Sequence, residues 1–174
     1  KFEADRVVEE FAVSHRLPVA ILYPGSVLGP GDPKSSGQYV ADIVHRRLPM
    51  AVFSDNVMTW VHVDDVTDAI SRLLQRDDAG GARYVVGRHR LTMHQINGLI
   101  QEVSGVQPPR VEMPDWLARL TAAVLTAWST VTGQPPLWGL SAEVARTLVH
   151  SIQADGTRAE RDLGLSYSDI RTAI

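Results

Sequence analysis

The sequence lacks several features that would point to a particular class of protein. It contains no cysteine, which excludes disulfide bonds, thiolate metal sites and a cysteine nucleophile. It has no uninterrupted apolar run of ~20 residues, so we expect no transmembrane segment. The net charge of −3 comes without a basic stripe, and we therefore expect no nucleic-acid partner.

No self-sufficient active-site motif is present either. The sequence has no P-loop, no Gly-x-Ser-x-Gly, no His-Glu-x-x-His and no Gly-x-Gly-x-x-Gly, the patterns that would identify an active site by themselves. Its six histidines show no metal-ligand spacing, so no metal site is predicted. What is present is the composition of a globular domain, with 44% hydrophobic and 21% charged residues.

The length of 174 residues is enough for one domain and too short for two ordinary ones. The chain starts at Lys1 inside a helical pattern, with no methionine and no capping residue before it. We therefore expect the sequence to be the C-terminal part of a longer protein.

The first two predicted elements are a helix and a strand. Over residues 2–12, apolar side chains recur at helical spacing, which predicts a helix packed on a core by one stripe. The stripe consists of Ala4, Val7, Val8, Phe11 and Ala12. The apolar run at residues 19–23 predicts a strand buried on both faces. A helix followed by such a strand is typical of α/β proteins.

A loop and a second strand follow. Segment 24–33 is rich in glycine and proline, which predicts an irregular loop at the C-terminal end of the first strand. In open parallel sheets, ligands bind at this end. A second strand is predicted at residues 57–63, and an amphipathic helix from 66 to 74 with Asp64 or Asp65 as its N-cap.

Local signals also define elements in the second half of the chain. Thr92 and Gln95 form a capping box for a helix that Gly105 ends. Another helix is predicted from residue 114 to 132, with its large apolar side chains turned inward. These side chains are Leu117, Leu120, Val124 and Val131.

Three blocks of the sequence, in this order, resemble the motifs of extended short-chain dehydrogenases/reductases. Residues 1–8 resemble the K-x-x-x-[DE] helix start that follows the family's catalytic tyrosine. Residues 17–32 resemble its R-P-x-x-V-x-G-P-x-D strand and loop, and residues 60–66 resemble its f-x-H-V-D-D-V block. Tyr23 stands where the family usually has arginine. The T-G-x-P-P segment at 132–136 adds a likeness to the dihydroflavonol-reductase-like and hopanoid-associated epimerase group.

The resemblance implies an α/β fold, namely the C-terminal part of a doubly wound Rossmann-like parallel sheet with a smaller, mostly helical substrate-binding subdomain. We expect residues 1–36 and about 57–75 to belong to the Rossmann part. The rest of residues 1–174 would be mainly substrate subdomain. An N-terminal half with the glycine-rich cofactor loop is expected outside this chain.

Five residues acquire expected roles from the resemblance. Lys1 is expected to be catalytic, because its ammonium group would lower the pKa of a tyrosine four residues earlier and bind the nicotinamide ribose. The backbone of Pro24, Gly25, Ser26 and Val27 is expected to hold the cofactor's carboxamide. The cofactor would be NAD or NADP.

The expected function of the parent is an NAD(P)-dependent oxidoreductase or epimerase that acts on a hydroxyl or carbonyl group of a small or polycyclic substrate. Nucleotide-sugar members carry a diphosphate-binding arginine before the H-V-D-D block, whereas residues 53–61 contain no arginine or lysine. Arg46, Arg47 or Arg88 could substitute, so a nucleotide-sugar epimerase/dehydratase stays an alternative, and a non-catalytic NAD(P)-binding regulator is another.

The remaining expectations concern the fragment and its setting. The fragment alone is expected to be inactive. The expected partner is a small-molecule substrate, a homodimer is left open as the assembly, and the expected location is the cytoplasm.

Overall fold

The computed structural model describes residues 2–32, 35–150 and 153–174. Within them, the strands form three small sheets with the orders β1-β5, β2-β4-β6 and β3-β7. All pairs are parallel except β4 with β6, which is antiparallel. The strands are β1 (Ile21–Pro24), β2 (Ser26–Leu28), β3 (Ala51–Val52), β4 (Val57–His62), β5 (Arg83–Val86), β6 (His89–Thr92) and β7 (Glu112–Met113).

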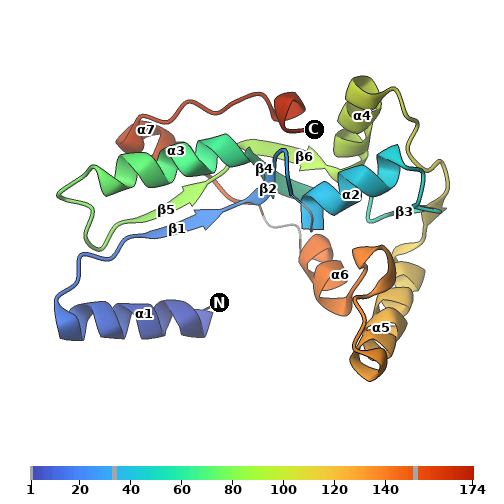
Figure 1. The fold of residues 1–174 in the computed structure, drawn as a ribbon, viewed down its shortest axis with the longest axis horizontal. Coiled ribbons are helices and arrows are strands. Elements are labelled where there is room, and N and C mark those ends of the chain that lie inside the picture. The colour runs from blue at the N-terminus through green and yellow to red at the C-terminus, as the bar shows by residue number, and fades with distance from the viewer. Residues whose placement is uncertain (1, 33–34, 151–152) are drawn as a thin grey trace.

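Helices lie on both sides of the strands and beside them. Figure 1 shows α3 and α7 on one side of β1 and β5 and α1 on the other, with α5 and α6 away from these two strands. This is the α/β architecture that the sequence predicts. The helices are α1 (Phe2–His15), α2 (Ser35–Val44), α3 (Val63–Leu74), α4 (Met93–Ser104), α5 (Asp115–Thr132), α6 (Ala142–Val149) and α7 (Thr157–Leu163), with short 3-10 turns η1 (Leu137–Gly139) and η2 (Ile170–Ala173).

Three apolar clusters hold these elements together. One lies between β4, β5, α3 and α7 and includes Val61 and Val86. A second joins β2, β4, α2 and α4, and reaches Ile170 in η2 near the end of the chain. The third is smaller and packs α5 and α6 on Phe53. The C-terminal residues are therefore part of the core.

Most helix boundaries follow the local signals in the sequence. The capping box of Thr92 and Gln95 is formed at the start of α4, and Gly105 ends that helix in the left-handed conformation with φ 71°. The predicted cap of α3 is wrong. His62 is the N-cap, because its Nδ1 accepts a hydrogen bond of 3.0 Å from the backbone N–H of Asp64. The prediction chose Asp64 or Asp65 because aspartate is a common N-cap, whereas histidine is an unusual one.

The predicted inward face of α1 is also wrong. Val7, Val8 and Phe11 are exposed, whereas Asp5 and Glu9 are half-buried and face the strands. Polar contacts with β1 and β5 determine this orientation. With its helix attached in this way, β1 is half-buried rather than buried on both faces as predicted.

The predicted inward face of α5 holds only for Leu117, which is half-buried, because long-range packing sets the orientation of this helix. Leu120, Val124 and Val131 are exposed, and the small residues Ala118 and Ala122 are buried instead. None of the described helices is long and apolar enough to cross a membrane.

Candidate functional site

The chain changes partner strands between Pro24 and Ser26. Up to Pro24 the backbone pairs with β5, and the N–H of Gly25 continues this pairing with a 2.8 Å hydrogen bond to the carbonyl of Val86. From Ser26 onward it pairs with β4, where Ser26 lies opposite Trp60. The candidate cofactor loop is therefore a crossing between two parallel strand pairs.

This crossing is tightly packed around Thr59. A Cβ at Gly25 would lie 2.5 Å from the backbone oxygen of Thr59, so glycine is required there by close approach. The Thr59 hydroxyl donates to the carbonyl oxygen of Ala154 at 3.2 Å and accepts from its N–H at 2.8 Å. Thr59 and Ala154, which are 95 positions apart in the sequence, thus hold the crossing in place.

The loop after β2 is equally constrained. A Cβ at Gly29 would lie 2.2 Å from the Cγ1 atom of Val63, at the start of α3. The carboxylate of Asp32 accepts a 2.8 Å hydrogen bond from the N–H of Gly37 in α2. A cavity of about 590 Å³ lies beside the loop. It is lined by Ser26, Val27, Gly29, Pro30, Gly31, Asp32, Ser36 and Val63.

The four predicted cofactor residues occupy different positions in this loop. Ser26 and Val27 line the cavity, whereas Pro24 is exposed and Gly25 lies against Thr59. Lys1 lies outside the described residues. Among the described strands β2 has one hydrogen-bonded neighbour, β4, so backbone groups on its other edge are free to bind a ligand.

Two side-chain contacts attach α1 to the strands. The hydroxyl of Tyr23 donates a 3.0 Å hydrogen bond to Asp5, and Arg83 forms an ion pair with Glu9. Asp5 and Glu9 are one turn apart on α1, and their partner strands β1 and β5 are neighbours in the sheet. The two contacts therefore lie side by side between the same face of the helix and the sheet. Asp5 lies four positions after Lys1 in the sequence. These contacts therefore fix the orientation of α1 against β1 and β5.

Three described tyrosines have a raised pKa. Burial raises that of Tyr39 to about 12, although its hydrogen bond to Asn97 opposes the shift. Burial, followed by the contact with Asp5, raises the pKa of Tyr23. Burial also raises the pKa of Tyr167. These hydroxyls stay protonated at neutral pH, which does not suit a tyrosinate base.

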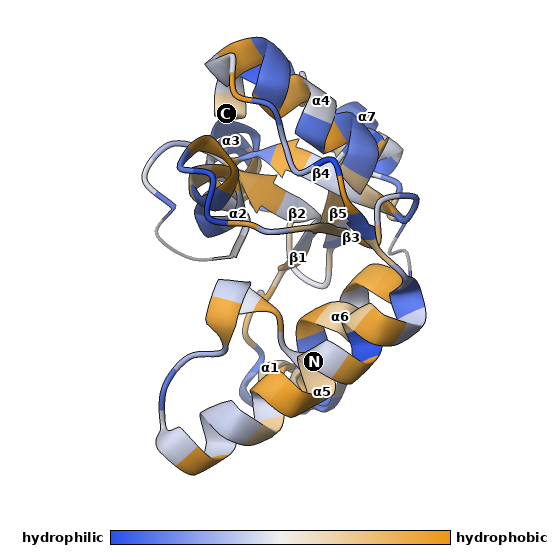
Figure 2. Ribbon diagram, turned by 90° about the vertical axis from the view of Figure 1, so that its right-hand side faces the viewer, coloured by the Kyte–Doolittle hydropathy of each residue, from blue (hydrophilic) through white to orange (hydrophobic). Residues whose placement is uncertain are grey.

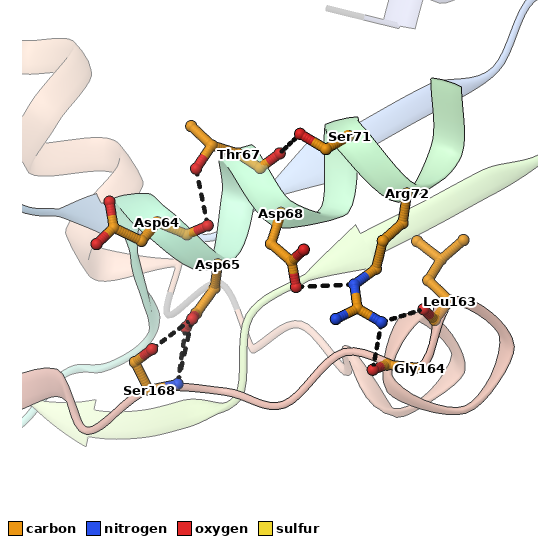
Figure 3. Close-up of polar contacts among 9 residues, drawn as sticks. All are labelled: Asp64, Asp65, Thr67, Asp68, Ser71, Arg72, Leu163, Gly164 and Ser168. Carbon is orange, nitrogen blue, oxygen red and sulfur yellow. Dashed lines mark hydrogen bonds and ion pairs between the residues drawn. The ribbon is translucent and has the colours of Figure 1, made fainter. Parts of the chain in front are cut away.

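The H-V-D-D block has a structural role that sequence reasoning recognised only in part (Figure 3). Asp65 is buried, and its carboxylate accepts from the N–H of Ser168 at 3.1 Å and from the Ser168 hydroxyl at 2.7 Å. On the same helix, Arg72 donates to the carbonyls of Leu163 and Gly164 at the end of α7. Helix α3 thus holds the C-terminal segment in place. The partner of Asp65 lies 103 residues away, so no local signal could have identified it.

No group of three or more His, Asp or Glu side chains among the described residues could hold a metal ion. Met58, Trp60 and Val61 are buried in the core. Arg47 is paired with Asp42 and Arg88 with Glu160.

A family model and individual proteins resemble this chain. Residues 1–87 match the model described as the NAD dependent epimerase/dehydratase family. A putative dihydroflavonol 4-reductase from Synechocystis sp. is 23% identical over 161 residues, covering 90% of this chain and 46% of that protein. Sterol demethylase protein B from Methylococcus capsulatus is 27% identical over 160 residues, covering 91% of this chain and 48% of that protein. The chain thus spans about half the length of the curated relatives it matches.

Solved structures share the fold. A nucleoside-diphosphate-sugar epimerase from Pseudomonas aeruginosa superimposes with a TM-score of 0.72 and 24% identity, covering 99% of this chain and 50% of that one. Two further structures, with TM-scores of 0.64 and 0.66, were solved with NADPH and with NAD⁺. At these identities the likeness concerns the fold alone.

Proposed function

Since the chain belongs to the NAD dependent epimerase/dehydratase family, we propose that its parent protein is an NAD(P)-dependent oxidoreductase. Its substrate would be a small or polycyclic compound with a hydroxyl or carbonyl group, without a nucleotide. The observation that carries the proposal is the family match over residues 1–87. These residues include both Lys1 and the β1–β2 loop beside the cavity.

We propose distinct roles for the two parts of this site. The backbone of the segment from Pro24 to Val27 would orient the nicotinamide through the free edge of β2. Lys1 would hold a proton on its ammonium group and favour the anion of a tyrosine one helical turn earlier. When bound, NAD(P) supplies hydride exchange with the alcohol or carbonyl carbon. The choice between NAD and NADP belongs to residues outside this chain.

The proposed substrate class rests on residues 53–61, which contain no arginine or lysine. A diphosphate removed from water requires a charged partner, and arginine matches it best. The side chains of Met58 and Trp60 are buried in the core, and Arg47 and Arg88 already have carboxylate partners. The two curated relatives carry names of reductase or sterol-modifying proteins, which agrees with a substrate that lacks a diphosphate.

Two alternatives stay open. A nucleotide-sugar epimerase/dehydratase is favoured by the name of the Pseudomonas aeruginosa structure and by Arg46, which has no ion-pair partner among the described residues. A non-catalytic NAD(P)-binding regulator would keep the fold but lack the tyrosine four positions before Lys1. The sequence before Lys1 distinguishes this regulator from an enzyme, because only the enzyme would have that tyrosine. A homodimer and a cytoplasmic location remain predictions.

A substrate panel on the full-length protein tests the proposal. Turnover of aromatic or steroidal ketones and alcohols should exceed that of UDP- and GDP-sugars with at least one of the two cofactors. Faster turnover of a nucleotide sugar would contradict the substrate class. In the same assay, Lys1→Ala should reduce kcat strongly while the melting temperature stays nearly unchanged, because the proposed role is electrostatic.

A further inference from the structure

The outer face of α5 is apolar although no described residue covers it. Trp116 and Trp128 are 67% and 62% exposed. At spacings of four and seven residues, Leu120, Val124 and Val131 complete the stripe on the same side of the helix, and all three are exposed. We call these five residues the α5 stripe. It presents two indole rings and three aliphatic side chains to the solvent.

The opposite face of α5 shows that this orientation is set by packing. Ala118 and Ala122 are fully buried against the cluster that includes Phe53. The hydroxyl of Thr126 accepts a 2.8 Å hydrogen bond from the N–H of Ala142, which begins α6. Figure 2 shows α5 and α6 together, with hydrophobic segments along α5. The helix thus turns its small residues inward and its bulky apolar residues outward.

A neighbouring segment shows a third exposed indole. Trp138 in η1 is 45% exposed, and its backbone is in the left-handed region at φ 55°. That conformation is unfavourable for a bulky residue and persists only where the surrounding structure holds it. The region after α5 therefore also holds an aromatic side chain at the surface.

The size of the stripe argues against a second copy of the chain as its partner. An α-helix of 18 residues is about 27 Å long and about 10 Å wide, so its outer face covers about 270 Å². A stable protein interface needs about 800 Å² from each partner. A lipid surface has no such requirement, because it adapts its shape to the inserted side chains.

The chemistry of the stripe matches the boundary between lipid tails and headgroups. Tryptophan is enriched there because its ring is apolar and its N–H can bond to polar groups. The stripe contains no charged residue. Arg119, which is exposed on the flank of Trp116, has no ion-pair partner among the residues that the structure describes. Its guanidinium group could reach lipid phosphates while its stem lies along apolar surface.

We propose that the α5 stripe binds the surface of a lipid bilayer, with α5 lying in the interface rather than crossing it. The surface would allow the enzyme to take a poorly water-soluble substrate from the bilayer. That purpose rests on the proposed function, whereas the binding itself rests on the stripe.

Vesicle binding by the full-length protein tests this proposal without cofactor or substrate. The protein should sediment with phosphatidylcholine vesicles, and brominated lipids should quench its tryptophan fluorescence. The double variant W116Q/W128Q should bind vesicles at least about tenfold more weakly than the wild type, because it loses two large apolar contacts. Phe11→Ser is the matched control, since Phe11 is a 54% exposed aromatic residue on α1, and it should bind like the wild type.

The next three outcomes overturn the proposal, and the last one overturns only the proposed substrate. Absence of vesicle binding by the wild type, or equal loss in the Phe11→Ser variant, would exclude a specific role of the stripe. A dimer that W116Q/W128Q converts to a monomer, without vesicle binding, would identify a second copy as the partner. Protection of Trp116 and Trp128 from hydroxyl-radical labelling in the free wild-type protein would show that another part of the protein covers the stripe. Vesicle binding with turnover of nucleotide sugars alone would refute the proposed substrate and leave this surface in place.

Discussion

Tyr23 at the end of β1 donates a 3.0 Å hydrogen bond to Asp5 of α1. This contact and the ion pair of Glu9 with Arg83 join α1 to two strands of the sheet, β1 and β5. The apolar stripe of α1 is exposed. Arginine usually stands at position 23 in the family that the sequence resembles, and a tyrosine at this position still provides a donor to the helix.

We predict that Tyr23→Phe loosens α1 with little effect on the rest of the fold. Loss of one partly buried hydrogen bond should destabilise the docked helix by about 1 kcal/mol. Amide hydrogen exchange in α1 should accelerate about fivefold, with the amides of α4 unchanged. Tyr23→Arg should restore slow exchange, because arginine can pair with Asp5. Equal exchange in wild type and Tyr23→Phe would show that this contact does not hold the helix.

Asp65 should be far more important for stability than its neighbour Asp64. Asp65→Asn keeps the size of the side chain but places an amide N–H₂ next to the donors of Ser168, which should cost about 2 kcal/mol. Asp64 is the matched control, since its side chain is 80% exposed, and Asp64→Asn should cost less than about 1 kcal/mol. Urea denaturation measures both. Similar losses in the two variants would contradict the structural role of Asp65.

A glycine pair tests the packing of the crossing. Gly25→Ala would place a Cβ 2.5 Å from the backbone oxygen of Thr59, and strand pairing prevents this oxygen from moving. We expect destabilisation by about 2–3 kcal/mol. A Cβ at Gly98 in α4 meets no atom within 4 Å, so Gly98→Ala should stabilise the helix by about 0.5–1 kcal/mol. Thermal unfolding of both variants is the measurement, and a harmless Gly25→Ala would show that the crossing is loosely packed.

The pKa of Tyr39 predicts a loss of stability in alkali. In the folded protein this pKa is raised to about 12 by burial, whereas in the unfolded chain it should be about 10. The contribution is therefore fully present below pH ~10 and disappears as the pH rises toward ~12, by about 2–3 kcal/mol. Tyr39→Phe should be less stable at neutral pH, because the buried Asn97 loses its donor, and its stability should fall less between these pH values. Parallel pH profiles in the two proteins would contradict the raised pKa.

Local sequence rules predicted the elements better than their orientation. The capping box at Thr92 and the glycine at 105 involve neighbouring residues, so the sequence alone was sufficient. The apolar stripes on α1 and α5 were recognised as helical, but a period does not say which face is covered. Polar contacts at Asp5 and buried alanines at 118 and 122 decide that.

In the candidate site, too, local features were predicted from the sequence and long-range contacts were not. The loop from Pro24 to Val27 was found from its turn formers and its resemblance to a family, and Ser26 and Val27 do line a cavity. The contact of Gly25 with Thr59 and the anchoring of Asp65 to Ser168 depend on residues far apart in the sequence. Such partners meet only in the folded chain. The role of Lys1 stays a prediction, because this residue lies outside the described range.

The contacts of the C-terminal segment also determine the order in which the protein can be completed during synthesis. Thr59 bonds to a residue 95 positions later, and Asp65 to one 103 positions later. Ile170 and Ala173 enter the core beside β4. The growing chain on a ribosome therefore has β4 exposed on one side until residues 154–173 have emerged. Contacts between such distant segments form slowly, and during that interval the hydrophobic residues of β4 are open to chaperones.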